Sequence, residues 1–154
     1  MLDRVFPRQL SNDYQGSPLA KWVFIGVTIL TIARSLIHVF APDGGAQSIA
    51  TIPLDTYSAN AAATVILIFS LWGLSQLLIG LIYVVVIWRY QMLIPFMYLL
   101  MVVEYGMRIF LSLVKPIETT RTAPGEVGNY LLLPLALVML FLSLRRTQPI
   151  ALRN

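Results

Sequence analysis

Four long blocks of apolar residues, separated by short polar segments, dominate the pattern of the chain. A helix rises about 1.5 Å per residue, so about 20 apolar residues cross the roughly 30 Å hydrocarbon core of a bilayer. The sequence therefore predicts an all-α fold, an integral membrane four-helix bundle that forms one domain over residues 18–146. The predicted helices cover about residues 18–40, 60–88, 92–114 and 128–144.

Proline, glycine and small polar residues mark the helix boundaries. Ser17-Pro18 has the pattern of an N-cap followed by proline at the first helical position, and Pro42 ends that helix. The turn at Arg89-Tyr90-Gln91 is so short that the second and third helices are expected to be antiparallel neighbours. Pro124-Gly125 predicts a turn before the last helix.

Lysine and arginine are distributed unequally between the two sides of the predicted bundle. Positive residues gather in the short cytoplasmic loops of membrane proteins. The side that carries only Lys115 and Arg121 is therefore expected to face outward, with both termini in the cytoplasm. Residues 1–17 and 147–154 then form cytoplasmic tails, and the expected location is the inner membrane of a bacterium. The more positive side holds Arg4, Arg8, Lys21, Arg89, Arg145, Arg146 and Arg153.

Composition supports the membrane class and excludes several others. Of the 154 residues, 58% are hydrophobic and 12% are charged, whereas soluble domains carry about 25% charged residues. The chain has no cysteine, which excludes disulfides, cysteine zinc sites and iron–sulfur clusters. The net charge of +4 comes from residues at loops and termini, so no nucleic-acid partner is expected.

Three charged residues, Arg34, Glu104 and Arg108, lie inside the apolar blocks together with His38 and Gln76. A charge at the bilayer centre costs at least about 2.5 kcal/mol, so such residues face the bundle interior or a cavity and find partners. Counting from the cytoplasmic interface places Arg34, Gln76 and Glu104 at similar depth, about 16 Å into the membrane. His38 and Arg108 follow one turn farther outward on their own helices.

These matched depths predict two contacts between the first and third helices, an Arg34–Glu104 salt bridge and a His38–Arg108 contact. Two arginines against one glutamate leave a positive surplus, and guanidinium groups recognise carboxylate and phosphate through paired hydrogen bonds. We therefore expect binding or transport of an anionic or amphiphilic small ligand or lipid at a buried cluster. In the alternative, the same charges only hold the helices in register. The cluster comprises Arg34, His38, Gln76, Glu104, Arg108 and Lys115, the last at the outer rim.

Signatures of catalysis and of metal binding are missing from the sequence. His38 is the single histidine, which excludes a haem with two histidine ligands and a metal site with several histidines within one chain. No Gly-x-Ser-x-Gly or His-Glu-x-x-His motif occurs. An intramembrane enzyme is therefore the weakest hypothesis, because a reaction needs several convergent acid, base or metal groups. The sequence identifies no cofactor.

Small residues form a stripe on the second helix, where Ser70, Gly73 and Gly80 follow near-heptad spacing. Such a stripe allows close helix packing, within the chain or, alternatively, between subunits. We expect Trp72, near the middle of that helix, to serve packing. The last helix has no charge within its span and is expected to face lipid or a neighbouring subunit. The expected partners are thus membrane lipid and either further copies of the chain or a larger membrane complex.

The run Gly-Leu-Ser-Gln-Leu-Leu-Ile-Gly from Gly73 to Gly80, taken with the size and the four-span layout, resembles the DoxX-like group of small bacterial membrane proteins. The resemblance covers the general layout of residues 20–145 and transfers no functional residue. Three classes of function stay open at this point. They are ligand binding or transport, a structural subunit of a membrane complex, and an intramembrane enzyme.

Overall fold

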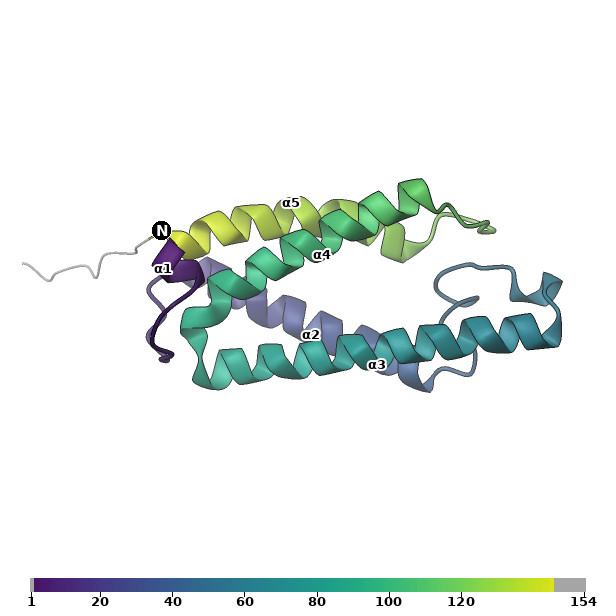
Figure 1. Ribbon diagram of the computed structural model, residues 1–154, viewed down its shortest axis with the longest axis horizontal. Helices are drawn as coiled ribbons and strands as arrows, with labels where there is room; N and C mark the ends of the chain where they lie inside the picture. Colours follow the sequence, from purple (N-terminus) through teal and green to yellow (C-terminus); the bar gives the residue numbers. More distant parts are fainter. Residues whose placement is uncertain (1, 146–154) are drawn as a thin grey trace, which may run out of the picture.

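The computed structural model describes residues 2–145 and is entirely helical in its regular structure (Figure 1). Four of its helices are long and apolar enough to cross a membrane, which confirms the predicted all-α, four-span class. Which termini face the cytoplasm stays a prediction, and Arg146, Arg153 and the segment 147–154 lie outside the described residues. The elements are α1 (Leu2–Val5), α2 (Pro18–Phe40), η1 (Leu54–Thr56), α3 (Ala59–Arg89), η2 (Gln91–Leu93), α4 (Ile94–Val114) and α5 (Pro124–Leu144).

Most helix boundaries lie where the sequence predicts them. Helix α2 begins at Pro18 after an extended Ser17, although the Ser17 side chain makes no capping hydrogen bond. Helix α5 differs, because it begins at Pro124, four residues before the predicted start. The predicted turn at Pro124-Gly125 is therefore wrong. Proline fits the first turn of a helix, where its missing N–H needs no partner, and Ala123 before it is extended.

The four long helices are arranged as two pairs. Helix α2 packs along α3, and α4 packs along α5. The pairs converge at the end that carries the α3–α4 turn, here called the turn end, and diverge toward the end that carries residues 41–58 and 115–123, here called the loop end (Figure 1). Helices α3 and α4 are antiparallel, but they contact each other far less than either contacts its own partner. The prediction that they pack as neighbours is thus not supported along most of their length.

Two glycines explain the close packing within the first pair. A Cβ atom added to Gly73 would lie 2.5 Å from the Cβ of His38, and one added to Gly80 would lie 2.8 Å from Cγ1 of Ile32. Both partners belong to α2. The small residues of α3 therefore allow the α2 backbone to approach, which confirms packing within the chain as the use of this stripe.

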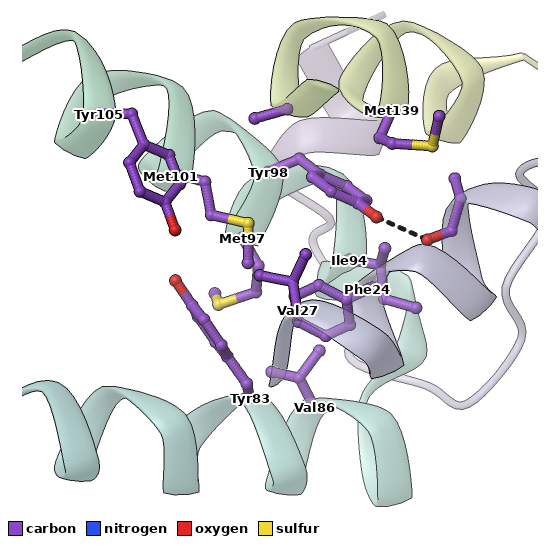
Figure 2. Close-up of a cluster of buried hydrophobic side chains, with 12 residues drawn as sticks. Phe24, Val27, Tyr83, Val86, Ile94, Met97, Tyr98, Met101, Tyr105 and Met139 are labelled. Atoms are coloured by element: carbon purple, nitrogen blue, oxygen red, sulfur yellow. Dashed lines mark hydrogen bonds between the residues drawn. The ribbon is translucent and has the colours of Figure 1, made fainter. Parts of the chain in front are cut away.

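The largest core cluster lies toward the turn end and takes residues from all four long helices (Figure 2). The ring of Phe24 contacts Tyr83 and Tyr98, with centroids 5.2 Å and 5.6 Å apart. The Tyr98 hydroxyl donates a 2.6 Å hydrogen bond to the backbone carbonyl of Ala20. This cluster joins the two helix pairs at one end, and thereby leaves the separation at the other end to be set by different contacts.

The N-terminal segment packs across the turn end. Arg4 donates a hydrogen bond to the backbone carbonyl of Leu144, and the rings of Phe6 and Phe96 lie 5.4 Å apart. The Tyr14 hydroxyl donates to the carbonyl of Ser17 over 3.2 Å, and burial raises the pKa of Tyr14 to about 12. The segment that the sequence suggests as a tail is therefore packed against the bundle, while its cytoplasmic location stays a prediction.

Candidate functional site

A cavity of about 360 Å³ lies between the two helix pairs toward the loop end. Its volume is within the range of small-molecule sites. All four long helices and the segment 41–58 contribute to its wall. We call it the interpair cavity, and its wall includes Leu30, Arg34, Trp72, Tyr105, Arg108 and Glu126.

Two arginines flank one aromatic ring in the wall of this cavity. The Cζ atom of Arg34 lies 5.4 Å from the ring centroid of Trp72, and that of Arg108 lies 4.9 Å from it. Trp72 also packs against His38, with ring centroids 4.8 Å apart, as the sequence suggests for a packing residue. Contact with the electron-rich indole face stabilises both guanidinium groups at partly dehydrated positions.

Glu104 is held from two helices. Its Oε1 accepts a 3.0 Å hydrogen bond from Nε2 of Gln76 on α3 and a 3.1 Å hydrogen bond from Nε of Arg108, one turn farther along α4. Arg108 and Glu104 also form an ion pair through Nη2. The predicted salt bridge between Arg34 and Glu104 is therefore wrong. Matched depth does not fix the direction of a side chain around its helix, and the i, i+4 partner on α4 was closer.

His38 also differs from its predicted role. Its side chain is buried, and Nδ1 lies 2.8 Å from the backbone carbonyl oxygen of Gly44. Because a carbonyl only accepts, Nδ1 carries the proton in this contact. Gly44 and Gly45 have φ values of 59° and 73°, a conformation that favours glycine, and they turn the chain back toward α2. The predicted contact of His38 with Arg108 is absent from the hydrogen bonds of the described residues, because the imidazole holds this loop.

The predicted cluster is thus not a buried one. His38 and Gln76 are buried, whereas Arg34, Glu104 and Arg108 are partly exposed. Lys115 is exposed at the end of α4 and does not line the cavity. The prediction of a buried Arg/Glu cluster is wrong, because the helix pairs separate at this level and leave the charged groups around a cavity.

Arg34 lacks a polar partner within the part of the chain that the structure describes. No hydrogen bond or ion pair joins its guanidinium to residues 2–145. Its guanidinium makes a cation–π contact with the ring of Trp72. Arg108, by contrast, shares the carboxylate of Glu104. A guanidinium carries five N–H donors, so Arg34 can still accommodate an anion.

The segment 41–58 covers the loop end of the cavity. Ile49 and Ala50 line the cavity, and Thr51 beside them donates from Oγ1 to the carbonyl of Arg121 over 2.7 Å. The backbone N–H of Thr120 donates to the carbonyl of Thr51 over 2.9 Å. These bonds of Thr51, Thr120 and Arg121, here called the loop contact, join the two helix pairs. Thr51 has φ 58°, which is unusual for a β-branched residue.

Asp43 orders the start of the same segment. Its carboxylate accepts hydrogen bonds from the backbone N–H groups of Gly45, Gln47 and Ser48 at 2.9, 3.1 and 2.6 Å. Burial raises the pKa of Asp43, but these backbone hydrogen bonds outweigh it and hold the pKa below its usual range. The ionised side chain therefore stabilises the fold of the loop that lies over the cavity.

Sequence reasoning did not identify Trp72 and Glu126 as parts of the site. Trp72 sits in an apolar helix, and nothing in the pattern shows which face of that helix meets the arginines. Glu126 falls in a stretch that the sequence suggests is a loop, but it lies in the first turn of α5 and lines the cavity. Within residues 2–145, no group of three His, Cys, Asp or Glu side chains could hold a metal ion.

Comparison of the chain with models of protein families, with curated proteins and with solved structures found no match.

Proposed function

We propose that this protein binds an amphiphilic small molecule or lipid, which carries an anionic group, in the interpair cavity. The observation that supports this most directly is Arg34, a cation in the cavity wall without a polar partner among the described residues. An unpaired charge in an apolar setting is costly, so an anion that accepts its hydrogen bonds lowers the free energy of the bundle. The apolar part of the ligand would contact Leu30 and neighbouring apolar residues.

The position of the cavity supports an amphiphile over a water-soluble anion. Its wall is formed by helices that are long and apolar enough to span a membrane. With the turn end in the cytoplasm, the cavity lies in the outer half of the bilayer. Arg4, Arg8, Lys21, Arg89 and Arg145 near the turn end favour this orientation. We also propose that the protein lies in a bacterial inner membrane, is oligomeric and belongs to the DoxX-like group. The alternatives are a structural subunit of a membrane complex and an intramembrane enzyme.

Native mass spectrometry of the full chain in mild detergent tests the proposal. We expect one lipid or amphiphile bound per chain, and we expect Arg34→Gln to lower its occupancy about tenfold, the effect of losing hydrogen bonds to a charged group. Arg121→Gln is the matched control, since this exposed arginine lies at the loop end outside the cavity wall. Equal occupancy in the parent and in Arg34→Gln would contradict the proposal.

A second variant blocks the cavity and leaves its charges unchanged. Gly128 lines the cavity, and a Cβ atom added there meets no other atom within 4 Å. Gly128→Leu should therefore fold and displace the ligand. Gly26→Leu is the control, because its Cβ also meets nothing within 4 Å and Gly26 lies outside the cavity wall. If both variants retain the ligand, it binds elsewhere and the proposed site is wrong.

A further inference from the structure

A second unpaired charge lines the same cavity. Glu126 is exposed in the first turn of α5, and within residues 2–145 its carboxylate forms no hydrogen bond or ion pair. It does not pair with Arg34, although both side chains contribute to the cavity wall. The cavity therefore presents a cation and an anion that do not satisfy each other.

The charges around the cavity sum to zero. Arg34 and Arg108 in the wall contribute two positive charges, and Glu126 in the wall contributes one negative charge. Glu104, which pairs with Arg108 but does not line the cavity, contributes the second negative charge. The Glu104 carboxylate is already paired with Arg108. A simple anion at Arg34 would satisfy the arginine but would be repelled by Glu126. A ligand that carries both an anionic and a cationic group would satisfy both, and the balance of charge in the cavity favours such a ligand.

The two charges lie at different depths. Arg34 lies six residues before the end of α2 at Phe40, whereas Glu126 is two residues after the start of α5 at Pro124. At 1.5 Å per residue, Arg34 is about 9 Å inside the loop end of its helix and Glu126 about 3 Å inside that of α5. A bound zwitterion would therefore place its anionic group deeper in the membrane and its cationic group nearer the loop end.

The exposed part of the cavity wall indicates where an apolar chain would leave. Leu30, Pro124, Gly125 and Glu126 are exposed, and they belong to α2 and to the start of α5. On the opposite side, Trp72, Tyr105 and Arg108 are buried or partly buried, and the Gln76–Glu104 hydrogen bond joins α3 to α4. The opening to the bilayer thus lies between α2 and α5.

Resting on the proposed function, we infer that the ligand is a zwitterionic amphiphile whose phosphate binds Arg34 and whose ammonium group binds Glu126. Its apolar chain leaves the cavity between α2 and α5. In a phosphoethanolamine head group the phosphate lies next to the chains and the ammonium group lies beyond it. That order matches the deeper arginine and the shallower glutamate.

The test compares two lipids with identical chains, phosphatidylethanolamine and phosphatidylglycerol, by native mass spectrometry of the full chain in detergent. We expect the parent protein to prefer phosphatidylethanolamine about fivefold, as a partly exposed charge pair allows. We expect Glu126→Gln to lose that preference. Glu118→Gln, an exposed glutamate outside the cavity wall, should retain it.

The outcomes separate this inference from the proposed function. Equal or stronger binding of phosphatidylglycerol by the parent, or an unchanged preference in Glu126→Gln, would overturn the zwitterion and leave the cavity site standing. Binding of both lipids that Gly128→Leu does not reduce would overturn the cavity site itself. Free phosphoethanolamine distinguishes two sources of the head group. Displacement of the lipid by it would indicate a soluble zwitterion, and retention of the lipid would indicate a membrane ligand.

Discussion

Tyr98 on α4 donates its hydroxyl hydrogen to the backbone carbonyl of Ala20 on α2, and this 2.6 Å bond joins the two helix pairs where they converge. Both residues are buried in the cluster of Figure 2. The carbonyl of Ala20 lies near the start of α2, close to the predicted membrane interface. The bond is therefore one of the contacts that set the angle between the pairs.

Removal of this hydroxyl should weaken the bundle without changing its core shape. We expect Tyr98→Phe to lower the free energy of unfolding by about 1 kcal/mol, the usual net value of a buried hydrogen bond. Thermal unfolding in detergent, followed by circular dichroism, measures the change. Tyr130→Phe is the control, since Tyr130 is half exposed. Equal losses in the two variants would show that the Ala20 contact contributes nothing specific.

Close approach of α2 and α3 predicts a large effect at Gly73. Its added Cβ would lie 2.5 Å from the Cβ of His38, so Gly73→Ala forces the helices apart and should cost about 1–3 kcal/mol. Gly106→Ala on α4 meets nothing within 4 Å and should be neutral or stabilising by up to about 1 kcal/mol. The same unfolding measurement compares them. A Gly73→Ala protein as stable as the Gly106→Ala protein would contradict the packing described for this pair.

The loop contact predicts a local change in backbone protection. Thr51→Val keeps the shape of the side chain but removes the donor to the Arg121 carbonyl. We expect amide hydrogen exchange in residues 115–123 to accelerate about fivefold, which corresponds to a loss of about 1 kcal/mol. Thr56→Val is the control, because the Thr56 hydroxyl bonds only to the nearby carbonyl of Pro53. Unchanged exchange in Thr51→Val would mean that the two hydrogen bonds from Thr120 to the Thr51 carbonyl suffice to join the two loops.

Asp43 predicts an acid-sensitive loop. Its pKa in the folded protein is depressed, so its stabilising effect is complete above the unfolded value of about 3.9. The effect is lost as pH falls below that value and through the folded pKa. Amide exchange at Gly45, Gln47 and Ser48 should therefore accelerate as pH falls below about 4, after correction for the intrinsic rate. Asp43→Asn should show fast exchange throughout, whereas Asp13→Asn at the turn end should behave like the parent.

The positions of the helices could be predicted from the sequence because the residue types at their ends and along their lengths determine where they begin and end. Pro18 and Pro42 bracket α2, and about twenty apolar residues in each block leave no other regular structure in a bilayer. The start of α5 was misplaced because Pro124-Gly125 is equally compatible with a turn and with the first turn of a helix.

The candidate site was only partly predictable, for a geometric reason. Helical rise gives the depth of Arg34 and Arg108, and both indeed line one cavity. Depth alone does not give the direction of a side chain around its helix, so the partners of Glu104 and His38 were wrong. The pairing of the helices was also not predictable, since short turns fix the order of antiparallel helices but not which of them pack closely. The separation of the pairs, and hence the cavity, follows from that pairing.

Because the helix pairs converge at the turn end, a small rotation of one pair relative to the other there produces a larger displacement at the loop end (Figure 1). Helix α4 has 21 residues and is about 31 Å long, so a rotation of about 5° at the Tyr98 end moves its far end by about 3 Å. A shift of that size, comparable to the diameter of a water molecule, changes the width of the cavity while the core near Phe24 hardly moves. Among the side-chain hydrogen bonds of the described residues, the bond between Gln76 and Glu104 and the bonds between Thr51 and residues 120–121 restrain that displacement. A molecule bound in the cavity would consequently hold the distance between the loops 41–58 and 115–123 at one value.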